Sequence, residues 1–146
     1  MAKISTGLRD HILTTGSFKD GVDGGVIFIY SGTPPATADA ALVGNTLLCV
    51  ISNDAAGTGI TMGTMANAGV LGKNPGEIWR GQVVASDTAT FYRFAALADD
   101  GTLSTTAKRV QGTVATLAAD LIFSNVNFVS GNYRQIDNYN VALPTA

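Results

Sequence analysis

Short apolar segments recur along this chain at a spacing of roughly ten residues, and turn-forming residues separate them. Val26–Tyr30, Leu47–Ser52 and Thr90–Leu97 are the clearest of these segments. The whole pattern predicts roughly seven or eight strands, which is typical of a β-sandwich or a barrel. We therefore predict an all-β fold, a single-domain β-sandwich of jelly-roll or Ig-like type, preceded by a short N-terminal helix. Residues 1–25 would form this helix and a glycine-rich arm, and residues 26–146 the sandwich.

The composition supports this fold class and excludes several others. Charged residues make up 14 % of the 146 residues, against roughly 25 % in ordinary domains, and Glu77 is the only glutamate. Long charged helices are therefore excluded, and the 46 % of hydrophobic residues argues against intrinsic disorder. The formal net charge of −2 offers nothing to nucleic acid or to an anionic membrane, so neither is an expected partner. The start of the chain lacks a signal-peptide pattern, so we expect synthesis in a cytoplasm.

Residues Ser5–Thr15 are expected to form the helix. Ile4, Leu8 and Ile12 recur every four residues and define one apolar face. Ser5 or Thr6 would cap the start, and Gly16 would end it. A helix of about ten residues is unstable alone, so it must dock on its own domain or on a neighbouring chain. The glycine-rich segment that follows, residues 17–25, is interpreted as turns, and residues 36–42 as one possible helical turn.

Alternation within the later strands predicts which side chains face inward. In Thr90–Leu97 it places Arg93 opposite the aromatic residues, and in Arg109–Ala115 it places Arg109 and Gln111 opposite the valines. Gln135–Leu143 is expected to be the closing strand. It would turn its apolar residues inward: Tyr139, Val141 and Leu143. Ile136 falls out of phase there and suggests a bulge.

The chain offers few residues for chemistry. His11 is the only histidine and Cys49 the only cysteine, and we interpret them as a structural or surface histidine and a core thiol. They are too few for a zinc site of the usual kinds. Calcium could use one of two aspartate pairs, but turn formation explains these residues better: Asp20 with Asp23, or Asp99 with Asp100. We expect no catalytic residues, no metal, no cofactor and no enzymatic activity.

Several segments of the chain carry a resemblance to a known class of proteins, and together they span nearly the whole chain: Val26–Ala41, Thr46–Ile51, Gly76–Trp79, Phe91–Phe94, Ala119–Phe128 and Ala142–Pro144. In these segments the chain resembles small virion proteins of tailed bacteriophages. The resemblance implies a non-enzymatic structural component of the virion, made in the host bacterial cytoplasm. One position it implies is the capsid exterior, as a decoration (cement) protein on the major capsid protein, forming a homo-oligomer with a trimer favoured. The other is the tail, baseplate or fibre, in host attachment.

Each position implies its own contact residues. For decoration we expect the N-terminal helix and the glycine-rich loops to contact the partner, although the helix could equally close one end of the sandwich. The expected contacts are as follows: Ile4, Leu8, Ile12, Lys19, Asp20 and Asp23, with the loop 53–73. For host attachment, exposed aromatic residues would stack on sugars, but we expect these residues to be buried instead: Trp79, Tyr92, Tyr133 and Tyr139.

Overall fold

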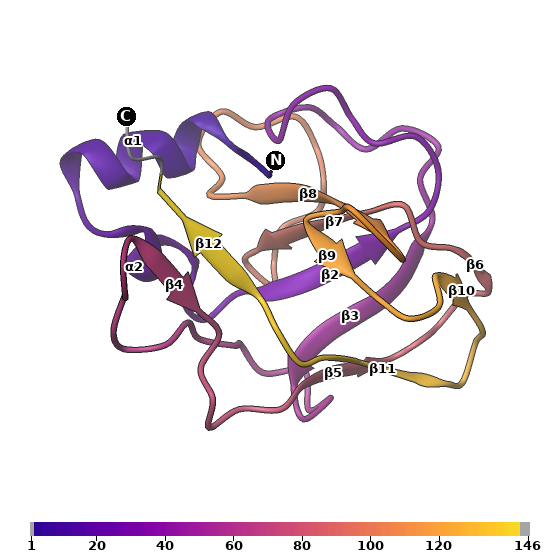
Figure 1. Ribbon diagram of the computed structural model, residues 1–146. Helices are drawn as coiled ribbons and strands as arrows, with labels where there is room; N and C mark the ends of the chain where they lie inside the picture. The colour runs from indigo at the N-terminus through magenta and orange to yellow at the C-terminus, as the bar shows by residue number, and fades with distance from the viewer. Residues whose placement is uncertain (1, 144–146) are drawn as a thin grey trace.

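The structure is a computed structural model that describes residues 2–143, so both ends of the predicted domain lie outside the described residues. Two short helices accompany twelve strands (Figure 1). The helices are α1 (Thr6–Thr14) and α2 (Phe18–Val22). The strands, in chain order, are as follows: β1 (Lys3–Ile4), β2 (Val26–Tyr30), β3 (Leu47–Asn53), β4 (Val70–Gly72), β5 (Trp79–Gln82), β6 (Asp87–Thr88), β7 (Phe91–Ala95), β8 (Val110–Ala115), β9 (Leu121–Ile122), β10 (Asn127–Phe128), β11 (Tyr133–Ile136) and β12 (Asn140–Ala142).

One large sheet forms the frame of the molecule. Its strands run in the order β1-β8-β7-β2-β3-β5-β11, and β9 is added to β8. All of these pairings are antiparallel except β8 with β9. Two separate strand pairs, β4–β12 and β6–β10, complete the strand structure. The predicted all-β fold is confirmed, and the layer opposite the large sheet consists of strand pairs rather than a second large sheet.

Strand β2 lies at the centre of the large sheet. It pairs with β7 on one side and β3 on the other, with Ile27 opposite both Phe94 and Ile51. All five of its residues are buried, as a continuous β-branched and aromatic run predicts. Both faces of the sheet are therefore covered at this strand.

The main core lies on the face of the sheet that carries Ile27. Trp79, Phe94 and Tyr139 meet there, with ring centroids about 6 Å apart. The layer above them contains partly buried Leu71 from β4 and Val141 from β12. In Figure 1 these two strands cross in front of the large sheet. The strand pairs therefore act as the second layer of the core.

On the opposite face, polar side chains of the sheet hold two long loops. Arg93 donates to the carbonyl oxygen of Ala40 at 2.7 Å, and Gln111 donates to that of Pro35 at 2.8 Å. Arg109 donates to the carbonyl oxygen of Thr102 at 2.8 Å. These three side chains do lie opposite the core-facing valines and aromatics, but the loops bury them completely.

The N-terminal helix forms where it was predicted. Ser5 caps α1, and its hydroxyl accepts a hydrogen bond from the Leu8 N–H. Gly7 brings the helix close to the 102–109 loop, because a Cβ at this position would lie 2.3 Å from the carbonyl oxygen of Thr106. The Leu8 side chain is fully buried in the main core. The helix therefore docks on its own domain.

Other expected elements differ from the structure. Residues 17–25 were interpreted as turns, but Ser17 caps the five-residue helix α2 there. Residues 36–40 form a run of bends rather than helix, with one turn-like hydrogen bond from the Ala40 N–H to the Thr37 carbonyl oxygen at 3.3 Å. The expected strand Gln135–Leu143 is two strands, β11 and β12, which belong to different sheets. Leu143 lies after the end of β12 and is exposed rather than inward.

Candidate functional site

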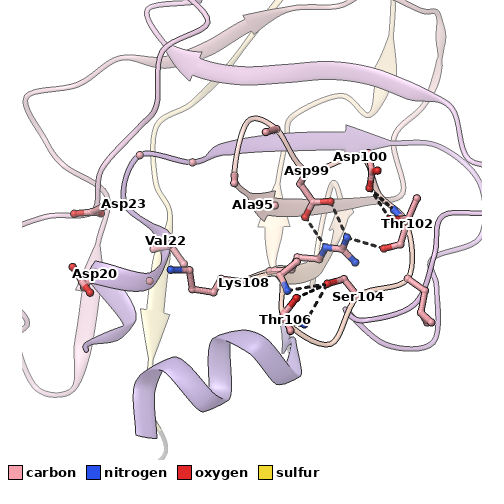
Figure 2. Close-up of a pocket in the computed structure, with 18 residues that line it drawn as sticks. Asp20, Val22, Asp23, Ala95, Asp99, Asp100, Thr102, Ser104, Thr106 and Lys108 are labelled. Carbon is pink, nitrogen blue, oxygen red and sulfur yellow. Dashed lines mark hydrogen bonds and ion pairs between the residues drawn. The ribbon is translucent and has the colours of Figure 1, made fainter. Parts of the chain in front are cut away.

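A cleft of about 630 Å³ separates the start of β2 from the loop that precedes β8. Residues 20–25 form one wall, and Ala95, Ala96 and residues 98–109 form the other. Three of the residues in the first wall are glycines, and four of those that line the second are alanines. The cleft brings together the two aspartate pairs noted in the sequence, one pair in each wall (Figure 2).

Asp99 is held by a buried ion pair with Arg109. The guanidinium donates from Nε at 2.6 Å and from an amino nitrogen at 2.8 Å, one bond to each carboxylate oxygen. Burial opposes the charge on Asp99, but the bonds from Arg109 and from the Gly101 N–H outweigh it and lower the pKa of Asp99. This carboxylate therefore stays ionised and fixes the loop.

Asp100 stabilises the same turn from the solvent side. Its carboxylate accepts hydrogen bonds from the Thr102 hydroxyl at 2.7 Å and from the Thr102 N–H at 3.0 Å. These bonds lower the pKa of Asp100. The neighbouring Gly101 has φ of +78°, a conformation that glycine adopts readily. The Asp-Asp-Gly sequence is thus a turn, as the sequence predicts.

The aspartates of the opposite wall are also engaged. Asp23 pairs with Lys19 and accepts a hydrogen bond from the Met62 N–H at 2.8 Å. Lys19 also donates to the Met62 carbonyl oxygen at 3.0 Å. Asp20 lies 3.1 Å from Nε2 of His11, and this contact connects α2 to α1. The four carboxylates therefore hold segments of the chain together.

Lys108 crosses the cleft. Figure 2 shows its side chain extending from the 102–109 loop toward Val22, between the two walls. Ser104 lies beside it and accepts hydrogen bonds from the N–H groups of Thr106 and Ala107. The cleft thus offers one exposed ammonium group among hydroxyls and ion-paired carboxylates. Such a surface suits recognition by shape and hydrogen bonds.

The described residues contain no cluster of side chains suited to a metal ion. Within residues 2–143, no group of three or more His, Cys, Asp or Glu side chains is placed to hold a metal ion. Glu77 instead accepts hydrogen bonds from the Thr61 N–H and hydroxyl and from the Trp79 indole. Burial opposes the charge on Glu77, but these three bonds prevail, and its pKa is lowered. The one glutamate thus anchors a loop to the core.

The expected contact residues do not form one surface. Asp20 and Asp23 line the cleft, whereas Ile4 lies on β1 with 37 % of its surface exposed. Ile12 is partly buried against the core. Leu8 is a correction, because its side chain is fully buried and offers nothing to a partner. The apolar spacing therefore predicted the face of α1 that packs on the core, and it did not identify the face exposed to solvent.

Other residues noted in the sequence are found in the core. Cys49 is fully buried, and burial raises the pKa of its thiol to about 12, as expected of a core cysteine. Trp79, Tyr92 and Tyr139 are buried, and only Tyr133 of the four candidate aromatics is exposed. Sequence reasoning missed Lys108 and its neighbours in the cleft. The only signal was their position after the Asp-Asp-Gly turn.

Comparisons with protein-family models, with curated proteins and with solved structures gave no match to this chain. Neither α1 nor α2 is long and apolar enough to cross a membrane, and no other helix occurs in residues 2–143. The functional argument therefore depends on the residues themselves and on the surface that they form.

Proposed function

We propose that this protein is a non-enzymatic structural component of a tailed-phage virion, and specifically a capsid decoration protein. It binds the outer surface of the major capsid protein lattice and stabilises the head. It is made in the host bacterial cytoplasm and assembles as a homo-oligomer, with a trimer suiting capsid symmetry. Nucleic acid, membrane and cofactors have no part in this function.

The observation that carries the proposal is the nature of the surface. Arg93, Arg109 and Asp99 act inside the fold, so their charges are withdrawn from solvent. Large apolar side chains are exposed instead, on the helix and on several loops. The most exposed examples are as follows: Leu13, Val43, Met65, Leu103 and Leu117. Exposed apolar groups among uncharged polar ones are suited to a permanent protein contact, because little charge has to be desolvated.

The contact we propose lies on the outer side of α1. Leu13, near the end of this helix, has 81 % of its surface exposed and is its most exposed large apolar residue. Leu13 takes the role that the sequence gave to Leu8.

A second candidate is a module of the tail, baseplate or fibre that takes part in host attachment. Tyr133 favours this candidate, because its ring is exposed and Arg80 stacks over it at 5.4 Å. An aromatic ring and a guanidinium at the surface form a common platform for sugars. The two candidates place the chain in different parts of the particle.

Reconstruction of the purified virion by cryo-electron microscopy tests the proposal. Density for this chain at many symmetry-related sites on the outer capsid is the expected result. Density only at the tail would favour the second candidate, and absence from the particle would reject both.

Binding of purified variants to particles that lack the protein tests the proposed contact. Leu13→Asp should reduce occupancy at least tenfold, because it places a charge in an apolar contact. Thr14→Asp adds the same charge beside it without removing an apolar group, and serves as the control. Equal occupancy of the two variants would reject the contact on α1.

A further inference from the structure

Two edge strands of the large sheet, β9 and β11, lie on opposite sides of one groove. Followed from β9, its strands run β9-β8-β7-β2-β3-β5-β11. Within residues 2–143, β9 pairs with β8 alone and β11 pairs with β5 alone. A groove of about 670 Å³ is lined by residues between 119 and 124 on one side and by residues 133–140 on the other. Figure 1 shows β9 near the middle of the view and β11 below it.

Strand β11 presents backbone groups to its open edge. The Asn132 carbonyl oxygen accepts a hydrogen bond from the Val83 N–H at 2.8 Å, so Asn132 points toward β5. Backbone groups alternate in direction along an antiparallel strand. The N–H and C=O groups of Tyr133 and Gln135 therefore point away from β5. An edge of this kind is a template for one more strand.

Apolar side chains also flank the groove. Ile122 on β9 and Tyr133 on β11 each have 56 % of their surface exposed. Phe123, Ile136 and Tyr139 are buried residues that line the groove. In an added strand between β9 and β11, alternate side chains point to the same face and could cover Ile122 and Tyr133. The groove therefore fits an extended peptide with alternating apolar residues.

The charged side chains that line the groove favour a peptide with a basic residue. Two carboxylates, Asp120 and Asp137, line it together with one guanidinium, that of Arg134. Asp120 is engaged by the N–H and hydroxyl of Thr113, and Asp137 accepts from the Gln135 amide at 2.8 Å. The excess of negative charge favours an incoming segment that carries a lysine or an arginine.

We propose that the groove between β9 and β11 binds an extended segment of a separate protein, which adds to the large sheet as a strand. The segment carries alternating apolar residues and at least one basic residue. The described strands are already paired within their own sheets, so none of them is available to fill the groove. Main-chain hydrogen bonds would supply affinity, and the side-chain contacts specificity. The inference holds wherever in a particle the protein is located.

A random library of synthetic peptides, each roughly nine residues long, tests the proposal on the complete protein. Retained peptides should show alternating apolar positions with a basic residue. Amide hydrogen exchange at Tyr133 and Gln135 should slow at least tenfold when such a peptide is bound. No retained peptide, or protection of amides elsewhere, would overturn the proposal.

Two matched comparisons test the backbone contact. Gln135→Pro removes an N–H at the open edge, whereas Gln135→Ala keeps it. Both variants lose the side-chain amide that bonds to Asp137, so the difference between them isolates the N–H, and peptide binding should be about tenfold weaker in Gln135→Pro than in Gln135→Ala. Peptides methylated at alternate backbone nitrogens test the same bonds without altering the protein, and they should also bind about tenfold more weakly. Equal binding of methylated and unmethylated peptides would refute strand addition. Protection that rises with protein concentration alone would place a second copy in the groove and refute a separate partner.

Discussion

Replacing Asp99 by asparagine should destabilise the protein strongly, because Arg109 would keep its charge in a buried site. The side chains of Asp99 and Arg109 are 8 % and 1 % exposed, and both bonds between them are short. Asparagine has nearly the same shape, so no cavity forms and the change isolates the charge. Removing one partner of a buried ion pair costs about 3–5 kcal/mol. This is a large part of the roughly 5–15 kcal/mol that stabilises a typical domain.

Urea unfolding followed by tryptophan fluorescence measures this loss, because Trp79 is the only tryptophan and is fully buried. Asp100→Asn is the matched control. It changes the adjacent aspartate, which is exposed and bonds only to Thr102, so its effect should be much smaller. A loss below about 1 kcal/mol for Asp99→Asn, or equal losses for the two variants, would refute the reasoning.

The same pair predicts a pH dependence with a definite sign. The pKa of Asp99 is lower in the folded protein than in the unfolded chain. Its charge therefore stabilises the protein above the unfolded pKa of about 3.9, and this contribution is lost as the pH falls through the folded pKa. The difference in stability between the native protein and Asp99→Asn should narrow below about pH 4. A difference that stays constant from pH 6 to pH 3 would contradict the assignment.

Three further predictions concern the core. Phe94→Ala should cost about 3–5 kcal/mol in urea unfolding because Phe94 is fully buried, whereas Leu117→Ala, at an exposed site, should change stability by less than about 0.5 kcal/mol. Cys49 should react with a thiol reagent only on unfolding, because it is fully buried and its pKa is raised to about 12; rapid reaction in native buffer would contradict this. Leu8→Asp should unfold the protein because it buries an unpaired charge; a circular dichroism spectrum like that of the native protein would contradict this.

Much of the frame follows from local sequence. Val26–Tyr30 forms β2 as predicted, because a β-branched and aromatic run has no polar face to present to water. The start of α1 was predictable from Ser5, which is a good capping residue at the right position. These elements depend on neighbouring residues, so the chain alone determines them.

The alternation of residues along the strands predicted which face of the sheet carries Arg93 and Gln111, but it did not predict that both side chains are buried. Their side was predicted correctly, yet loops 33–46 and 96–109 cover that face. The carbonyl groups that accept from Arg93 and Gln111 lie 53 and 76 residues away in the sequence, at Ala40 and Pro35, so no local pattern records the contact. The same is true of the cleft, because its two walls are far apart in the sequence.

The last strand shows where a pattern was interpreted too simply. Ile136 is out of phase with Tyr139, and a bulge seemed the local explanation. In the structure Ile136 ends β11, and the chain then leaves the large sheet for β12. A change of phase can mark a change of sheet as well as an extra residue. Only the pairing of β12 with β4, which is distant in sequence, distinguishes the two.

The bonds that secure residues 35–40 have a consequence for which substitutions this segment tolerates. Arg93, Arg109 and Gln111 hold it by its carbonyl oxygens, at Pro35, Thr37, Ala38, Asp39 and Ala40. Every amino acid supplies a carbonyl oxygen, so these bonds do not depend on the side chains of the segment. Ala38 is buried and the Asp39 carboxylate accepts from Thr6, so the fold does constrain these two side chains. The exposed residues Ala36 and Thr37 can therefore be replaced while the main-chain anchor keeps the path of the segment.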